Sequence, residues 1–163
     1  MSYMVLIKLL YLADRRTLIE TGAPLTGDRM VAMPHGPVLS QTYDFINMGQ
    51  PVDPDKPIAW YEYITEPHNY SISAKKKPET DELSQYELEV LADTFAKFGK
   101  MSKWALRDYT HTLPEWSDPQ GSSRPIEPET ILRASGKSDM EIEELVEEAE
   151  EVWFIRSLAS LAH

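Results

Sequence analysis

Histidines and aspartates are the residues with which acid–base chemistry would begin in this chain of 163 residues. A His–Asp pair is the minimum for general acid–base catalysis or for orienting a nucleophile. Four histidines are present, and three aspartates are candidate partners for the first of them; the set is His35, His68, His111 and His163 with Asp14, Asp28 and Asp44. Spacing along the chain does not by itself bring these side chains together.

The sequence lacks the patterns that would complete an active site. Neither G-x-S-x-G nor H-E-x-x-H occurs, and the absence of cysteine excludes disulfides, thiolate metal sites and cysteine nucleophiles. Residues 134–138 end like a phosphate-binding loop, but Ile131 stands where that loop needs glycine. We therefore expect no enzyme, no metal and no cofactor. A hydrolase or transferase that uses His35 with a carboxylate is the enzymatic alternative.

Structural roles explain two of the histidines without catalysis. His35 precedes Gly36 and Pro37, and we interpret it as fixing the turn in front of the proline. His111 follows Thr110 at a predicted helix end, where a histidinium would complement the negative end of the helix dipole.

Charge and composition limit the functional classes. A formal net charge of -11 argues against a general nucleic-acid binder, because phosphate contacts need a basic surface. The acidic excess is concentrated between Ile126 and Glu151, where ten acidic residues face two basic ones. The N-terminal segment is apolar, but Lys8 interrupts it well short of the roughly 20 residues of a membrane span, so we expect a cytoplasmic protein.

The first half of the chain predicts a helix, a strand and a second helix. Apolar residues recur at helical spacing from Leu6, and the chain stays compatible with a helix as far as Thr21, where Gly22 and Pro24 end it. The apolar residues lie on several faces of this helix, which indicates burial on more than one side. Residues 30–33 read as a short strand, and Gly36 as the N-cap of a helix over 38–47. Residues 53–57 read as a loop.

The second half predicts a β-hairpin followed by helices. Residues 60–65 and 70–73 have the composition of paired strands. Ser84 with Glu87 matches a capping box for a helix that ends at Gly99, and Ser102 caps the next helix, which continues toward His111. A loop over 117–125, a short helix over 128–134 and a long acidic helix from about Asp139 to Leu161 complete an α+β chain that is predominantly α-helical.

The acidic C-terminal helix has two interpretations. Its glutamates form a solvated face, or they steer a basic partner toward the protein. The residues that follow them, Trp153, Phe154 and Ile155, belong either to the core or to an interface.

An ordered series of short motifs resembles the Panacea domain, the domain of SocA-like antitoxins and of GepA-like phage-associated proteins. The series is KLLYLAD at 8–14, TGDR at 26–29, HGPV at 35–38, Tyr43-Asp44, Leu83-Ser84, WAL at 104–106, Thr110-His111 and PEW at 114–116. It covers about Met4 to Trp116. We therefore divide the chain into a Panacea-like core over 1–116 and an extension over 117–163, packed on that core.

The resemblance implies an antitoxin, encoded on a mobile element, that binds and neutralises a co-encoded toxin or delivers it to a AAA+ protease. It implies no catalysis and no cofactor. The motif residues would form a polar, backbone-shaping cluster that holds a recognition surface: Lys8, Tyr11, Asp14, Gly27, Asp28, His35, Gly36, Pro37, Tyr43, Asp44, Thr110, His111 and Trp116.

Two further expectations accompany the resemblance. Family members usually carry another helix ahead of the KLLY segment, so the extra apolar face of the first helix here would favour self-association or toxin capture. The alternative function is a DNA-binding regulator of its own operon, which would use a helix pair over 84–109 and the basic residues Lys97, Lys100, Lys103 and Arg107.

Overall fold

A computed structural model describes residues 1–49 and 59–161 of the chain. The fold is α+β and predominantly helical, as the sequence predicts. The elements follow in the order α1 (Tyr3–Thr21), β1 (Met30–Met33), β2 (Gly36–Leu39), α2 (Ser40–Asn47), α3 (Ala59–Tyr63), α4 (Gln85–Phe98), α5 (Lys103–His111), β3 (Arg124–Pro125), α6 (Pro128–Ala134) and α7 (Asp139–Leu161). The predicted loop over 53–57 and His163 lie outside the described residues.

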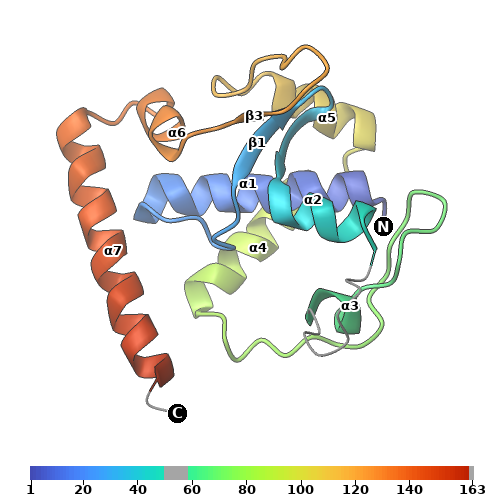
Figure 1. Cartoon of the computed structure of the whole chain (residues 1–163), viewed down its shortest axis with the longest axis horizontal. Coiled ribbons are helices and arrows are strands. Elements are labelled where there is room, and N and C mark those ends of the chain that lie inside the picture. Colours follow the sequence, from blue (N-terminus) through green and yellow to red (C-terminus); the bar gives the residue numbers. More distant parts are fainter. Residues whose placement is uncertain (50–58, 162–163) are drawn as a thin grey trace.

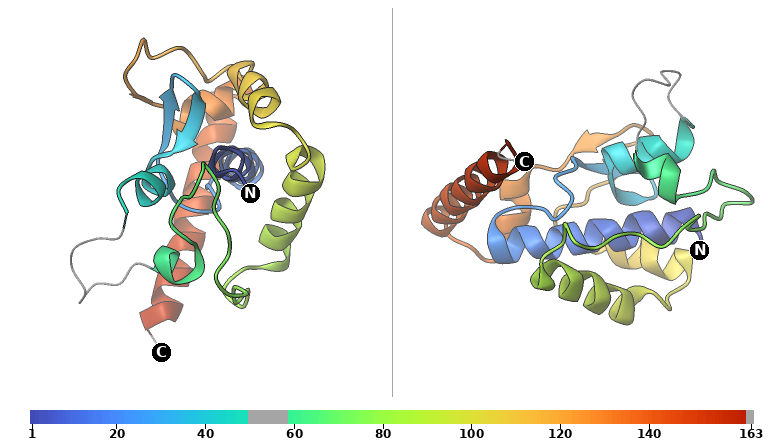
Figure 2. Two further views of the ribbon diagram at one scale, coloured as in Figure 1. Left: turned by 90° about the vertical axis from the view of Figure 1, so that its right-hand side faces the viewer. Right: turned by 90° about the horizontal axis from the view of Figure 1, so that it is seen from below.

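The first helix is the central element. In Figure 1 α1 runs through the middle of the molecule, and Figure 2 (left), which looks along it, shows the sheet and α2 on one side with α4 and α5 on the other. It contacts β2, α2, α4, α5 and α6. Within α1 every large apolar side chain is at least half-buried. Burial on more than one side is therefore confirmed, and this helix carries no exposed apolar face.

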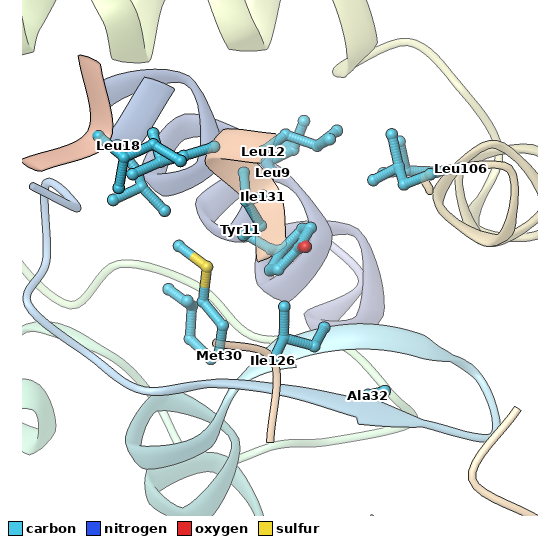
Figure 3. Packing of buried hydrophobic residues seen from close by; sticks show 13 residues of the cluster. Leu9, Tyr11, Leu12, Leu18, Met30, Ala32, Leu106, Ile126 and Ile131 are labelled. Carbon is cyan, nitrogen blue, oxygen red and sulfur yellow. The ribbon is translucent and has the colours of Figure 1, made fainter. Parts of the chain in front are cut away.

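The main core forms where α1 meets the sheet, α5 and α6. Figure 3 shows side chains from these elements around α1, with Met30 and Ile126 on the side of the sheet. Most of the cluster is less than a tenth exposed: Leu9, Tyr11, Leu12, Leu18, Met30, Ala32, Leu39, Leu106, Leu113, Ile126, Ile131, Leu132 and Ile142. Residues from the extension therefore belong to the same apolar cluster as α1.

The second strand of the sheet occupies the residues where a helix was predicted to start. Residues 36–39 form β2, which pairs with β1 in antiparallel register, Met30 opposite Leu39 and Met33 opposite Gly36. α2 begins only at Ser40. The Gly36 N-cap is wrong because strand pairing uses these residues. The cap comes instead from Asp28, whose carboxylate accepts from the backbone N–H groups of Gln41 and Thr42 at 2.9 and 2.8 Å.

A third strand was missed in the predicted loop over 117–125. Arg124 and Pro125 pair with Ala32 and Val31, so the sheet order is β2-β1-β3 and all pairs are antiparallel. A strand of two residues is too short to show the alternation of apolar and polar side chains from which a strand is predicted.

The predicted hairpin is wrong in both strands, because residues 60–63 lie in a helix and residues 70–73 form only isolated bridges. Residues 59–63 form the helix α3, packed so that Tyr61 is buried and donates to the Phe45 carbonyl at 3.0 Å. The reversal itself is real, because His68 and Ser71 exchange backbone hydrogen bonds around Asn69 and Tyr70, both with positive φ. Isolated bridges join Ile64 to Ala74 and Ser2 to Ser71.

The helices predicted from capping signals are confirmed. Ser84 and Glu87 form the capping box at the start of α4, and the Ser102 hydroxyl accepts from the Ala105 N–H at the start of α5. α6 has the predicted bounds and α7 follows it. The apolar side chains of α7 face the protein as far as Ala149, since Ile142 is buried and Leu145, Val146 and Ala149 are half-buried, whereas Val152 is 51% exposed.

A buried ion pair ties α1 to the segment after α5. The fully buried Glu115 carboxylate accepts from Arg15 Nε at 2.7 Å and Nη2 at 3.2 Å, and from the Tyr11 hydroxyl at 2.8 Å. Burial and the Glu115 carboxylate raise the pKa of Tyr11, so its hydroxyl stays a donor. The segment over 112–116 has little regular structure of its own and depends on this contact for its place.

We predict that Glu115→Ala destabilises the protein by about 3–5 kcal/mol, because it leaves a partly buried arginine and a buried hydroxyl without their acceptor. Urea unfolding measures the loss. Asp93→Ala is the matched control, since it removes the exposed partner of Arg16 and should cost less than about 1 kcal/mol. Equal losses of stability in the two variants would contradict the role of Glu115 as the buried acceptor.

Candidate functional site

Three segments of the family-like motifs meet at a buried lysine. Lys8 projects from α1, Gly36 and Pro37 come from the start of β2, and Thr110 and His111 end α5, with Trp116 beside them. We call this set the Lys8 centre. Because α1 contacts both β2 and α5, helix packing alone brings the three segments together.

The amine of Lys8 has almost no access to solvent. The residue is 1% exposed, and its Nζ donates to the Pro37 carbonyl at 2.6 Å. Burial lowers the pKa of Lys8 to about 7, since the charged form loses its hydration and gains no carboxylate partner. The lysine therefore acts as a hydrogen-bond donor that fixes the backbone of the turn, and a buried amine of this kind has no path to a substrate.

Gly36 is required by both conformation and space. Its φ is +92°, in the region that only glycine adopts without strain. A Cβ at this position would lie 2.7 Å from Thr110 Oγ1 and 2.8 Å from Lys8 Nζ. The turn thus packs its backbone directly onto Lys8 and the end of α5.

His111 and Trp116 close the centre on its other side. Their rings stack with centroids 3.8 Å apart and planes 5° from parallel, and Trp116 Nε1 donates to the Met33 carbonyl at 3.1 Å. Burial first, then the charges of Lys8 and Arg107, lower the pKa of His111. A lowered pKa disfavours the charged ring, so the surroundings of His111 oppose the predicted histidinium cap. Its buried Nε2 has no hydrogen-bond partner within the described residues.

His35 does not fix the turn with its side chain. The residue is exposed at the tip between β1 and β2, and it makes no hydrogen bond among the residues that the structure describes. The turn is held by Gly36, by Lys8 below it and by Trp116 at its side. His35 stands next to this rigid support with its imidazole in solvent.

A second polar group lies at the other end of α1. The buried Asp14 accepts from the Thr26 N–H at 3.0 Å and from the Thr26 hydroxyl at 2.5 Å. Burial raises the pKa of Asp14 to about 6. Asp28 accepts from the start of α2, and Thr26 Oγ1 accepts from the Asp28 N–H at 3.1 Å. This pair shapes the loop between α1 and β1 and contains no histidine.

The remaining predicted residues do not join the Lys8 centre. Tyr43 packs against the smaller apolar cluster under α2, and Asp44 contributes a backbone carbonyl to the end of that helix. Gly27 has a φ of +68° in open space. Tyr11 faces Glu115 instead. The predicted single cluster is therefore divided into the Lys8 centre, the Asp14–Asp28 loop and the Glu115 pair.

Sequence reasoning missed Thr26, Arg15 and Glu115. Thr26 and Glu115 stand inside the quoted TGDR and PEW motifs, and that position was the available signal. No group of three or more His, Asp or Glu side chains in the described parts of the chain is arranged to hold a metal ion. None of the described helices is long and apolar enough to cross a membrane.

A cleft of about 730 Å³ lies between α1 and the α4–α5 pair. Arginines line it beside aromatic side chains, but Arg15 is bound by Glu115, and Arg16 by Glu20 and Asp93. Phe98 and Tyr109 form one wall, with ring centroids 5.0 Å apart. The two arginines of this cleft are therefore already engaged in ion pairs.

The comparison with protein families identifies the domain. The model of the SocA-like antitoxins, the Panacea domain, matches residues 6–117, which contain the whole Lys8 centre. Because the match spans more than half of the chain, the protein belongs to the family of SocA-like antitoxins with a Panacea domain. Comparisons with curated proteins and with solved structures gave no match.

We predict that Gly36→Ala costs about 2–4 kcal/mol of stability, from backbone strain and from displacement of Lys8 and Thr110. Gly27→Ala is the matched control, because it also has positive φ but nothing within 4 Å of the new Cβ. That control should lose about 1 kcal/mol. Thermal unfolding of both variants measures the difference, and similar losses would show that the Lys8 contact tolerates a methyl group.

The lowered pKa of Lys8 predicts a pH-dependent stability. Between the folded value of about 7 and the ordinary value of 10.5, the unfolded chain binds one more proton than the folded chain, so stability rises with pH. Between pH 7 and pH 9, the free energy of unfolding of the wild type should rise by about 2 kcal/mol more than that of Lys8→Met.

Urea titrations at fixed pH values measure this gain. Lys97→Met, at an exposed position on α4, should run parallel to the wild type. If the stability of Lys8→Met changed with pH in the same way as that of the wild type, Lys8 would keep its proton in the folded protein over this range.

Proposed function

We propose that the protein is a cytoplasmic antitoxin that neutralises a co-encoded toxin by direct protein contact. The observation that carries this proposal is the family match over residues 6–117, which covers the central helix, both long strands and the Lys8 centre. The buried position of the Lys8 amine also favours a binding module over an enzyme, since a substrate has no access to it.

The tip of the β1–β2 turn is the toxin-contact element in this proposal. Pro34 and His35 are exposed there, while Gly36 and Pro37, directly behind them, are buried. A turn whose backbone is already fixed loses little conformational entropy on binding, so its exposed side chains contribute more of their contact energy to affinity. The Lys8 centre supports the recognition surface, and His35 is its exposed polar side chain.

Delivery of the toxin to a AAA+ protease is the other mode of neutralisation that the family offers. It requires the same first contact between antitoxin and toxin. The two modes differ in the fate of the toxin, which persists in a stable complex under sequestration and disappears under delivery.

The test is co-expression of this chain with the product of the adjacent reading frame, scored by growth and by co-purification. We expect rescue by the wild type, and at least about tenfold weaker toxin binding by His35→Ala. Because His35 is exposed, that variant should unfold at the wild-type temperature.

His68→Ala provides the matched control, since His68 is exposed in a different loop; it should bind like the wild type. Toxin levels with and without the protease separate sequestration from delivery. Absence of both rescue and complex would reject the antitoxin function for that pair, whereas normal binding by His35→Ala would reject only the proposed contact surface.

A further inference from the structure

A basic and aromatic patch lies on α5 and the neighbouring 64–74 segment. Tyr70 is 69% exposed and Trp104 is 49% exposed. The ammonium group of Lys103 lies 5.6 Å from the Tyr70 ring centre and 4.9 Å from the Trp104 ring centre, and the Arg107 guanidinium lies 5.0 Å from that of Trp104. We call these four residues the α5 patch.

The α5 patch has the chemistry to bind an anionic partner with apolar side chains. Its two cations rest over ring faces, which fixes their positions without neutralising their charge. Among the described residues, their one acidic partner is Asp108, which pairs with Arg107 at 2.5 Å. Exposed aromatic rings flanked by cations are typical of interfaces, because they bury area at low entropic cost.

A surface of matching chemistry lies on α7. Glu147, Glu150 and Glu151 line a hollow together with Phe154, which is 58% exposed. None of these three glutamates forms a salt bridge in the part of the chain that the structure describes, and Val152 and Ile155 nearby are more than half exposed. We call the three glutamates with Phe154 the α7 face.

The two surfaces match in spacing as well as in charge. Lys103 and Arg107 are four residues apart on one helix, and Glu147 and Glu151 are four residues apart on the other, so each pair spans about 6 Å along its helix axis. Helices laid side by side would therefore form two ion pairs one turn apart. Trp104, between the cations, would meet the hollow beside Phe154.

The two surfaces cannot meet within one molecule. α7 stands at one end of α1, and α5 with the 64–74 segment lies toward the other end, as Figure 1 and the right-hand view of Figure 2 agree. The complementary surface must come from another chain.

We propose that two copies of this protein associate head to tail, the α5 patch of one against the α7 face of the next. The contact is heterologous, so every copy keeps one free surface of each kind and chains of copies grow with concentration. Exposed ion pairs are weak and screened by salt, which makes the association reversible and salt-sensitive.

The test is sedimentation velocity of the purified chain from micromolar to near-millimolar concentration, at about 20 mM and about 500 mM salt. We expect the mean mass to rise above the 18.7 kDa monomer at low salt and to return to it at high salt. Trp104→Ala, which leaves the charge unchanged, should weaken the association at least about tenfold.

Two charge-reversal variants make the test specific. The first, Lys103→Glu with Arg107→Glu, lacks a working patch, and the second, Glu147→Lys with Glu151→Lys, lacks a working α7 face. Each should be monomeric alone. Mixed, the intact patch of the second variant meets the intact α7 face of the first, and the acidic patch of the first meets the basic face of the second, so the mixture should associate again through heterodimers.

Two controls match these changes in net charge at distant exposed sites. They are Arg29→Glu with Lys77→Glu, and Glu79→Lys with Glu82→Lys, and both should associate like the wild type. A wild type that stays monomeric at low salt overturns the proposal, as does a mixture that forms no heterodimer. Binding of a single-stranded oligonucleotide to the α5 patch of a monomeric wild type would assign the patch to nucleic acid instead. No toxin is present, so failure here leaves the antitoxin function untouched.

Discussion

Lys8 lies where three segments of the chain cross, and burial of its amine constrains all three. The amine needs an acceptor, and among the described residues it finds one in the carbonyl of Pro37, at 2.6 Å. That acceptor is available because Gly36 adopts a positive φ and has no side chain to separate the turn from α1 and α5. The end of α5 then places His111 against Trp116, whose indole binds the last carbonyl of β1. The Lys8–Pro37 hydrogen bond and the Trp116–Met33 hydrogen bond thus hold the two sides of the exposed tip.

The sequence predicted the elements whose signals are local. Ser84, Glu87 and Ser102 mark helix starts by side-chain capping, which operates within one turn, and those helices occur as predicted. The prediction failed where contacts between residues far apart in the chain determine the local structure. Residues 60–63 have the aromatic content of a strand, yet they form α3, in which Tyr61 is buried and donates to the Phe45 carbonyl. Val38 and Leu39 belong to β2 because β1 lies opposite, and no short-range signal records that pairing.

The site was predictable in membership but not in arrangement. The ordered motifs identified Lys8, Gly36, Thr110 and His111, which do lie together, and also Asp14 and Asp28, which form a separate loop contact. Protonation states were beyond sequence reasoning, because they follow from burial: a histidine at a helix end is ordinarily stabilised as a cation, but the pKa of His111 is lowered by its surroundings. Glu115 shows the same limit, since only the fold brings it to Arg15 and Tyr11.

The order of the small sheet has a consequence for how copies of this protein can meet. β2 and β3 are its two outer strands, and each contains a proline, Pro37 in one and Pro125 in the other. A proline has no N–H to offer to an incoming strand, so both edges interrupt the ladder that edge-to-edge pairing requires. The sheet is thereby protected against β-extension, the route by which exposed strands nucleate insoluble aggregates.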